Sequence, residues 1–517
     1  MEKRFNITGS CDPDTDYMVD ISEKLKQVRK MIDGGDYFTI NRARQFGKTT
    51  MLDAIWKNMS GQYLVLSTSF EGIGDTPFES PSAFVKSFYR LMAEYMEAFG
   101  EDKSLTAIWK QADSQTIEDL SSTITRFCKA CPRPVVLLID EVDRSSDNQL
   151  FLSFIGMLRN KYLVRKRLGM NSTFHSVVLA GVYDVKNLKL KLRPDAERKY
   201  NSPWNIAAKF NVDMSFNPQE IGTMLTAYEN DKRTGMDVTA ISNEIYKFTS
   251  GYPFLVSAIC KTIDEELDGD WTTEGIQKAV NLAVKNESTL FDDLTKNLEI
   301  YPDYKQFLYS TLMNSDDGII YEQNNPTMRL GKIFSVIKPD ADGKVMIHNL
   351  IFEQVLYNYF IAEEAIRNTS TRKYRSKFVE NGKLQMADII SRFQFFMHEE
   401  YRKEDESFIE RQGRLLFLSF LKPIINGSGF YYVEPQTREN SRMDLIVTFG
   451  GEEFVIELKI WRGQKYEIKG EVQLAEYLET RGLDKGYLVT FDFSKNKIER
   501  EADWIECNGK RIFEAVV

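Results

Sequence analysis

The stretch that most constrains this chain is 41–50, which lies between a short apolar run at 37–40 and the start of a helix pattern. It reads Asn-Arg-Ala-Arg-Gln-Phe-Gly-Lys-Thr-Thr. In a loop between a strand and a helix N-terminus, backbone N–H groups surround phosphates. Gly47 lets the backbone approach, Lys48 reaches the β- and γ-phosphate oxygens, and the Thr49 hydroxyl holds Mg²⁺. The stretch therefore predicts a nucleotide-phosphate loop, although its first glycine is replaced by Arg42.

A second element supports this interpretation of a degenerate motif. The continuous apolar run at 135–139 is typical of a strand buried on both faces of a parallel sheet, and it ends in Asp140 and Glu141. This pattern resembles a Walker B strand. Asp140 would bind Mg²⁺ through water, and Glu141 would polarise the water that attacks the γ-phosphate. The alternative is a buried strand followed by two solvated acids, but its pairing with the loop favours a nucleotide site.

With both elements, the N-terminal part resembles bacterial AAA-like P-loop ATPases, whose loop reads R-x-R-x-F-G-K-[ST]. The missing first glycine is that family's own form. The resemblance implies an α/β, ASCE/AAA-like P-loop NTPase fold that binds ATP. It also implies that the residues at the nucleotide are Arg42, Arg44, Gln45, Phe46, Gly47, Lys48, Thr49, Thr50 and Asp140, with Glu141 catalytic.

The next expected strand, 175–181, adds candidates on the γ-phosphate side. In AAA-like proteins a polar residue at the end of this strand senses the γ-phosphate, which points to Asp184. Arg193 and Arg198 precede a further strand expected at 210–214, in a region that can present an arginine finger to a neighbouring subunit. Of the two interpretations, arginine finger or solvated loop residues, we favour solvated loop residues for Arg193 and Arg198. A homo-oligomer is nevertheless expected from the resemblance.

Composition sets outer bounds on the class of protein. The 517 residues, 42% of them hydrophobic and 28% charged, predict a globular protein of two to four domains. We expect a cytoplasmic protein without a membrane partner, because no apolar run approaches the roughly 20 residues of a membrane span. The net charge of −9 disfavours a surface that coats nucleic acid, but it leaves room for a local basic groove.

Cysteines and histidines offer little chemistry. Five cysteines predict reduced thiols, and the spacing of Cys128 and Cys131 has no second pair to complete a metal site. The three histidines, at 175, 348 and 398, are scattered. Catalysis by histidine is therefore not expected.

Changes in the periodicity of apolar residues divide the chain into expected domains. Helical periodicity follows the α/β part, and Gly251 and Pro253 resemble the G-x-P step that opens a lid helix in STAND and AAA-like ATPases. Two short β-patterned runs, at 331–337 and 343–349, follow helical segments, and this order resembles a winged helix. A winged helix either binds DNA or packs against its neighbours as a regulatory lid, and we favour packing. The expected domains are an ATPase core at 1–215, a helical lid at 216–285, a winged-helix-like module at 286–366, a connector at 367–400 and a C-terminal domain at 401–517.

The C-terminal domain carries a second constellation. Two β-patterned runs, 441–449 and 453–459, are joined at Gly450 and Gly451, which is a hairpin signal. In a hairpin centred between these glycines, Asp444 lies directly opposite Glu457.

Lys459 lies on the same face as Glu457, two residues along the strand. Two carboxylates so close repel each other unless a cation separates them, and oxygen ligands suit Mg²⁺, with Mn²⁺ as the alternative. The alternative is a hairpin on the protein surface with pairs of charges across its strands. The apolar residues at 455, 456 and 458, which flank Glu457, instead favour a strand in the interior of a sheet.

This set is the D…E-x-K core of PD-(D/E)xK nucleases, which the segment 401–517 resembles. The proline that names the motif is replaced by Met443, a position that ligates nothing. The resemblance implies catalytic roles for Asp444, Glu457, Lys459 and Gln473, and metal ligation by Glu410, Asp444 and Glu457. The favoured function is an ATP-regulated, Mg²⁺-dependent nuclease that cleaves DNA in preference to RNA, with defence against foreign nucleic acid suggested by analogy. The alternative is a STAND-like switch whose nuclease-like domain binds nucleic acid without cleaving it.

Overall fold

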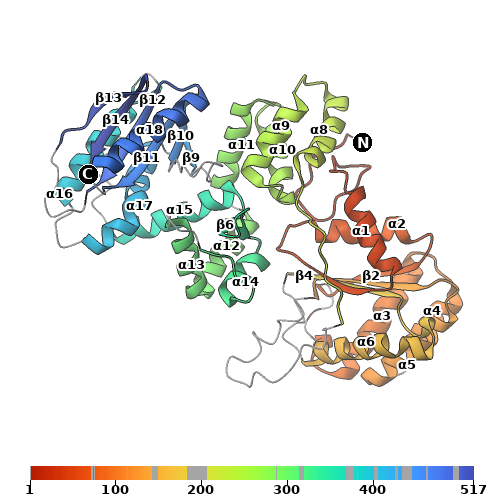
Figure 1. Cartoon of the computed structure of the whole chain (residues 1–517). Helices are drawn as coiled ribbons and strands as arrows, with labels where there is room; N and C mark the ends of the chain where they lie inside the picture. Colours follow the sequence, from red (N-terminus) through yellow and green to blue (C-terminus); the bar gives the residue numbers. More distant parts are fainter. Residues whose placement is uncertain are drawn as a thin grey trace. The chain divides into compact units, whose positions relative to one another are not determined.

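The computed structural model describes residues 2–71, 74, 76–112, 115–142, 149–182, 206–286, 288–313, 319–367, 378–380, 382–400, 406–425, 429–432, 445–461, 464–492 and 500–517. The chain divides into two compact units (Figure 1). The N-terminal unit comprises Met1–Tyr246, Ser250–Gly269 and Arg329–Ser335. The C-terminal unit comprises Lys247–Thr249, Asp270–Met328 and Val336–Val517. Within the described ranges, no helix combines the length and apolar character that a membrane crossing requires.

A four-stranded parallel sheet is the centre of the N-terminal unit. Its order is β1-β4-β3-β2, with β4 between the strands that precede the two nucleotide motifs. Every residue of β3 and β4 is buried, as the apolar runs predict. The strands are β1 (Tyr37–Asn41), β2 (Leu64–Ser69), β3 (Val135–Asp140) and β4 (Ser176–Gly181).

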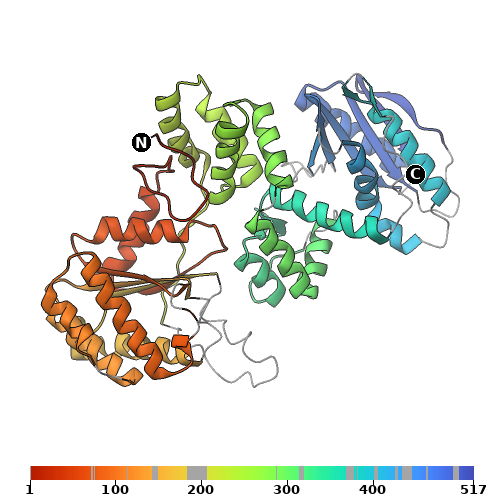
Figure 2. The same cartoon turned by 180° about the vertical axis from the view of Figure 1, so that it is seen from behind.

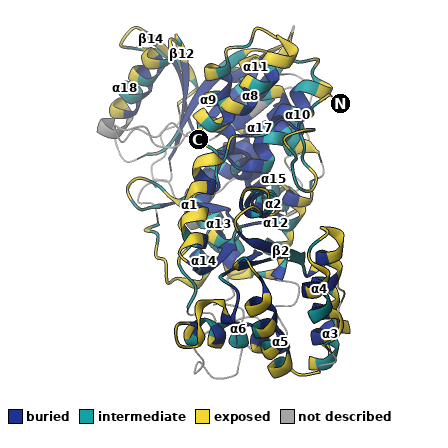
Figure 3. Ribbon diagram, turned by 90° about the vertical axis from the view of Figure 1, so that its right-hand side faces the viewer, coloured by how far each residue is buried: buried dark blue, intermediate teal, exposed yellow. Residues whose placement is uncertain are grey.

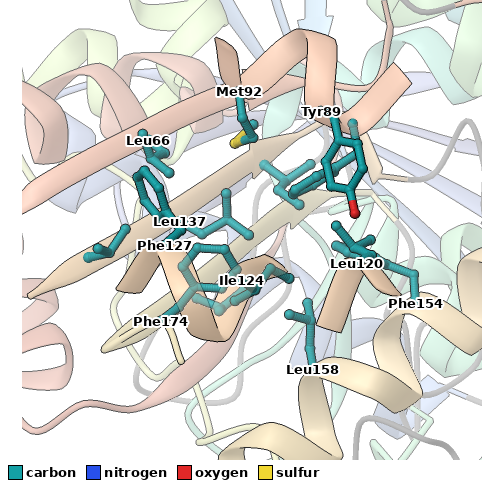
Figure 4. Packing of buried hydrophobic residues seen from close by; sticks show 14 of the residues in the cluster. Leu66, Tyr89, Met92, Leu120, Ile124, Phe127, Leu137, Phe154, Leu158 and Phe174 are labelled. Carbon is teal, nitrogen blue, oxygen red and sulfur yellow. The ribbon is translucent and has the colours of Figure 1, made fainter. Parts of the chain in front are cut away.

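Helices cover both faces of this sheet, so its strands alternate between two cores. Val135, Leu137 and Ile139 belong to a buried cluster with α3, α5 and α6 (Figure 4). The helices α1 and α2 lie on the opposite side of the sheet (Figure 1), and exposed residues mark the outer faces of helices such as α1 and α5 (Figure 3). The helices are α1 (Ser22–Asp33), α2 (Lys48–Met59), η2 (Thr76–Phe78), α3 (Pro81–Ala98), α4 (Lys103–Lys110), α5 (Ile117–Ala130), α6 (Gln149–Leu168) and η4 (Met170–Ser172).

The strand expected at 210–214 does not form. A single bridge joins Phe38 to Ala208 beside β1, and the chain then continues without strand structure. Beyond this bridge, the ring of Phe210 stacks on that of Phe38, and the carbonyl of Val212 accepts a hydrogen bond from the Arg42 guanidinium. Side-chain contacts therefore hold this segment beside β1.

The three helices α8 (Pro218–Lys232), α9 (Val238–Thr249) and α10 (Pro253–Glu266) follow in the region expected to be a lid. Asn217 and Glu220 form a capping box at the start of α8. Pro253 begins α10, where its missing N–H costs nothing, as predicted from the G-x-P step. The last helix of that expected region, α11 (Thr273–Lys285), falls in the C-terminal unit.

A helical segment with a small hairpin opens the C-terminal unit. The hairpin pairs β5 with β6 in antiparallel fashion, as a wing would. The β excursion expected from 331 is shorter than predicted, because α14 continues through Ile333 before the strand begins. The elements are α12 (Thr289–Ile300), α13 (Pro302–Met313), β5 (Ile337–Pro339), β6 (Val345–Ile347) and α15 (Leu350–Arg367). The helix α14 (Pro326–Ile333) lies between α13 and β5 in sequence, and its residues from Arg329 on belong to the N-terminal unit.

A mixed six-stranded sheet, in the order β13-β14-β12-β11-β10-β9, forms the rest of this unit. One face packs against α18 through a core that includes Val455 and Leu474. Aromatic residues of α16 and α17 pack together with Phe491 of β12. Figures 1 and 2 show these helices beside the sheet. The elements are β7 (Val379–Glu380), β8 (Lys383–Leu384), α16 (Met386–Glu400), α17 (Glu406–Ile425), β9 (Gly429–Tyr432), β10 (Leu445–Phe449), β11 (Glu452–Ile460), α18 (Gln464–Arg481), β12 (Lys485–Phe491), β13 (Asp503–Cys507) and β14 (Lys510–Val516).

Helix α16 lies inside 367–400, the segment expected to be a connector. Its Gln394 side chain donates to the carbonyl oxygens of Arg500 (2.9 Å) and Val516 (2.7 Å), and its Phe393 ring contacts that of Phe417. This helix is therefore part of the C-terminal sheet domain rather than a solvated linker.

The hairpin of β10 and β11 has the predicted register over its described residues. Leu445 pairs with Ile456 and Phe449 with Glu452. The turn is made by Gly450 and Gly451, whose φ angles of +59° and +79° are easily adopted only by glycine.

Candidate functional site

The loop between β1 and α2 has the backbone of a phosphate-binding turn. Gly47 has a φ of +75° in the left-handed region and forms the N-cap of α2, which begins at Lys48. Gln45 also has a positive φ, of 56°. These angles turn the chain sharply into the helix, so the backbone N–H groups of its first turn are the ones that a phosphate would meet.

Lys48 folds back under the loop. It is only 5% exposed, and its Nζ donates to the carbonyl oxygens of Arg42 (3.2 Å) and Ala43 (3.0 Å). These carbonyl oxygens are neutral acceptors, and an anionic phosphate at the same loop would be a stronger one.

The two nucleotide motifs meet through one hydrogen bond. The Thr49 hydroxyl, in the first turn of α2, donates to Oδ2 of Asp140 at the end of β3, at 2.7 Å. Asp140 is 7% exposed, and its Oδ1 accepts from the backbone N–H of Glu141 at 2.9 Å. Glu141 itself has a positive φ of 52°, a strained angle for a non-glycine residue that turns the chain away from the strand.

These residues fit Mg²⁺. A hydroxyl and a carboxylate oxygen 2.7 Å apart are hard oxygen donors of the kind that Mg²⁺ takes, together with retained waters and phosphate oxygens. When bound, the ion would neutralise charge on the phosphates. Thr49 and Asp140 are the residues that would hold it.

Arg42 braces the loop from its other side. Its guanidinium donates to the carbonyl oxygens of Asn41 and Val212, both at 2.8 Å, and it lies 5.5 Å from the ring centroid of Phe210. Burial lowers the pKa of Arg42, and the charge of Asp213 opposes this shift. These contacts give Arg42 a structural role in this loop, and a direct contact with nucleotide stays a prediction.

Sequence reasoning missed a second clamp on the loop, which comes from Tyr252. Its hydroxyl donates to the carbonyl oxygen of Arg44 at 2.8 Å, and its ring contacts that of Phe46 at 4.6 Å between centroids. Gly251 places this tyrosine, because a Cβ there would lie 1.8 Å from the carbonyl oxygen of Phe216. The signal available in the sequence was the aromatic residue inside the G-x-P step.

A pocket of about 370 Å³ adjoins the loop. Its lining combines loop residues 45–47 and 50 with residues of the N-terminal segment 6–24, with Met214 and Phe216, and with Phe254 of α10. A mostly apolar pocket with a few polar groups, beside a phosphate loop, suits a planar base.

We call residues 2–20 the strap, because they link this loop to the lid within the N-terminal unit. On the loop side, the backbone N–H of Cys11 donates to the hydroxyl of Thr50 at 3.3 Å. On the lid side, the Tyr17 hydroxyl donates to Asp231 at 3.1 Å, and the Asp20 backbone N–H donates to Thr223 at 2.9 Å. The Thr50 hydroxyl thus contacts the strap, and its contact with a nucleotide stays a prediction.

The second candidate site lies on β11 and α18. Glu457 is 1% exposed, and its Oε1 lies 2.7 Å from Nζ of Lys459. The same Nζ donates to Oε1 of Gln473 on α18 at 3.0 Å. The structure therefore brings together three of the predicted residues, from an interior strand and the helix that covers it.

For five other predicted residues, the structure describes no contact with either candidate site. Glu410 lies on α17, whereas Asp184, Arg193, Arg198 and Asp444 lie outside the described residues. Among the residues that the structure does describe, no group of three or more His, Cys, Asp or Glu side chains gathers as a metal site. The buried Glu457 carboxylate is a suitable oxygen donor for Mg²⁺ or Mn²⁺, and a complete ligand set stays a prediction.

Solved structures similar to this chain include a Walker-type ATPase of Pyrococcus abyssi, at 10% identity and a TM-score of 0.48, covering 68% of this chain and 99% of that one. The ORC1 protein of Aeropyrum pernix in complex with DNA is 11% identical, with a TM-score of 0.29 and coverage of 67% and 94%. The ORC2 protein of the same organism, in an ADP form, is 11% identical, with a TM-score of 0.36 and coverage of 70% and 98%. No curated protein matches the sequence.

The pattern of the AAA-like domain family matches residues 8–317. This range contains the phosphate loop, the end of β3 and the lid helices described above. The chain belongs to the AAA-like domain family.

Proposed function

We propose that this protein binds and hydrolyses ATP with Mg²⁺, and that its nucleotide state regulates a metal-dependent nuclease activity of its C-terminal domain. DNA is the favoured substrate over RNA, and defence against foreign nucleic acid is the favoured context. A homo-oligomer is part of the proposal, with Asp184 as γ-phosphate sensor.

One observation carries the ATPase half of the proposal, namely the 2.7 Å hydrogen bond between Thr49 and Asp140. It joins the first turn of the loop helix to the end of the buried strand, so both oxygen donors face the place where the phosphates would lie. Lys48 would exchange its carbonyl contacts for phosphate oxygens, which are stronger acceptors. Glu141, next to Asp140, would orient and polarise the attacking water.

The nuclease half rests on the Lys459 ammonium, which is held between the Glu457 carboxylate and the Gln473 amide. An interior strand rarely carries a carboxylate and an ammonium without a functional reason, because burying charge is costly even when it is paired. A fixed ammonium there would stabilise negative charge that develops on a phosphate during cleavage. Glu457 and Asp444 would hold the metal ion, which supplies charge stabilisation and an activated water.

The test is to measure ATP hydrolysis and nucleic-acid cleavage with the same purified protein. Plasmid, linear duplex and single-stranded DNA, and RNA, are incubated with Mg²⁺, with and without ATP. Wild-type protein is compared with Lys48→Ala and Lys459→Ala. We expect Lys459→Ala to lower cleavage on the order of 100-fold without changing ATP hydrolysis, and Lys48→Ala to stop hydrolysis and to change the cleavage rate.

Two outcomes would revise the proposal. Binding of nucleic acid without cleavage of any substrate would favour the STAND-like switch over the nuclease. Equal cleavage rates in Lys48→Ala and wild-type protein, with and without ATP, would remove nucleotide regulation.

A further inference from the structure

Gly470, inside α18, lies directly against the side chain of Lys459. A Cβ carbon added at this position would lie 2.7 Å from Nζ, 3.0 Å from Cδ and 3.3 Å from Cε of Lys459. Contacts below 3.0 Å are not tolerated, so a residue with a side chain here would displace the ammonium. The close approach exists only because residue 470 has no side chain.

Gly470 and Gln473 are three residues apart on α18, so they share one face of the helix. This face supplies two things to Lys459: space for its ammonium at Gly470, and an acceptor, the Gln473 amide oxygen, at 3.0 Å. Glu457 approaches the same ammonium at 2.7 Å. The ammonium is therefore fixed on three sides by groups that each lie in contact with it.

The helix itself gives no reason for a glycine at this place. Glycine in a helix interior is destabilising relative to alanine, because it loses more backbone freedom on folding. A buried glycine that weakens its own helix, and that contacts the end of a charged side chain, is explained by the space that the side chain needs.

We propose that Gly470 is a positioning residue, which sets the place of the Lys459 ammonium between Glu457 and Gln473. The proposal rests on the nuclease function proposed above and adds a residue to its site. Gly470 acts through Lys459 and does not contact the substrate itself.

The test is Gly470→Ala in the full-length protein, followed by steady-state cleavage with Mg²⁺. Nζ is the end of a flexible side chain, so it can move away and the fold survives. The moved ammonium loses its contact with Glu457 or Gln473 and no longer meets the charge that develops in the transition state. We expect kcat to fall roughly tenfold or more, with little change in KM.

A double-mutant cycle separates positioning from a structural role. Gly470→Ala is made in wild-type protein and in Lys459→Ala, where the atoms that it would meet are gone. In Lys459→Ala it should cause no further loss of cleavage and should raise the denaturation midpoint, as expected for alanine in a helix. In wild-type protein the midpoint should rise less or fall. Gly156→Ala on α6 is the matched control, because an added Cβ there meets no atom within 4 Å. It should shift the denaturation midpoint equally in wild-type protein and in Lys459→Ala.

The unfolding measurements keep this inference separate from the nuclease proposal. If the wild-type protein cleaves nothing, the nuclease proposal fails, while the cycle of denaturation midpoints still tests the contact between Gly470 and Lys459. Equal midpoint shifts in both backgrounds would overturn the inference. An unchanged kcat for Gly470→Ala in a cleaving protein would overturn it as well.

Discussion

The Tyr252 hydroxyl donates to the carbonyl oxygen of Arg44 at 2.8 Å, across 208 residues of sequence. Tyr252 is the N-cap residue of α10 and is completely buried, so the start of this helix is bonded to the middle of the phosphate loop. The contact makes the loop conformation depend on α10.

We therefore expect Tyr252→Phe to weaken nucleotide binding. The variant keeps the ring contact with Phe46 but loses the hydrogen bond, which contributes about 1 kcal/mol, or roughly fivefold in affinity. Titration with a fluorescent ATP analogue would measure the change. Tyr246→Phe on α9, where the side chain is exposed, is the control and should bind as wild type does. Equal affinities for the two variants would contradict the proposed coupling of α10 and the loop.

Lys48 and Glu141 should separate nucleotide binding from hydrolysis. Lys48→Ala removes a charge-assisted contact with phosphate and should abolish binding at micromolar ATP. Glu141→Gln keeps the shape of the side chain but cannot polarise water, so it should bind ATP and not hydrolyse it. Binding by calorimetry and phosphate release would check both variants. Wild-type hydrolysis by Glu141→Gln would refute the catalytic assignment.

The residues of the second site should affect metal affinity in opposite directions. Asp444→Asn and Glu457→Gln each remove a carboxylate and should weaken Mn²⁺ binding and stop cleavage. Lys459→Ala removes a competing cation, so it should leave Mn²⁺ binding intact or tighten it, and still lower cleavage on the order of 100-fold. Calorimetric titration would measure the Mn²⁺ affinity of each variant, and a cleavage assay would measure its rate. Glu452→Gln, on the same strand but paired with Lys383, should change neither.

The C-terminal unit should lose stability as the pH rises, because of Glu353 on α15. The residue keeps part of its surface exposed, yet protein atoms surround its carboxyl group. This desolvation raises its pKa from 4.5 to about 8, and the charge of Arg414 opposes the shift only in part. Between these two values the folded state holds a proton that the unfolded state has released, so the free energy of unfolding falls with rising pH.

Denaturant unfolding of wild-type protein and Glu353→Gln at several values between pH 5 and pH 9 would measure this effect. The amide cannot titrate, so the difference in free energy of unfolding between the two proteins should change across this window and become constant above it. A difference that is constant from pH 5 to pH 9 would rule out a raised pKa for Glu353.

The sequence by itself determined the local features of both sites. The pair of glycines at 450 and 451 and the two-residue period of the strands predicted the hairpin register that pairs Leu445 with Ile456. The pattern from Met51 predicted the helix that follows the loop, although α2 already begins at Lys48, and Pro253 predicted the start of α10. These features depend on residues close in sequence, where backbone geometry and side-chain alternation leave few choices.

Only the tertiary structure decided which distant groups meet. The bond from Thr49 to Asp140 spans 91 residues and joins α2 to β3, although β4 lies between β1 and β3 in the sheet. The segment 210–214 was expected to be a strand, but side-chain contacts hold it, among them the hydrogen bond from Arg42 to the carbonyl of Val212. The space that Gly470 leaves for Lys459 likewise depends on how closely α18 packs on β11. Such contacts follow from packing across the fold, and no local pattern of residues encodes a distance between two elements.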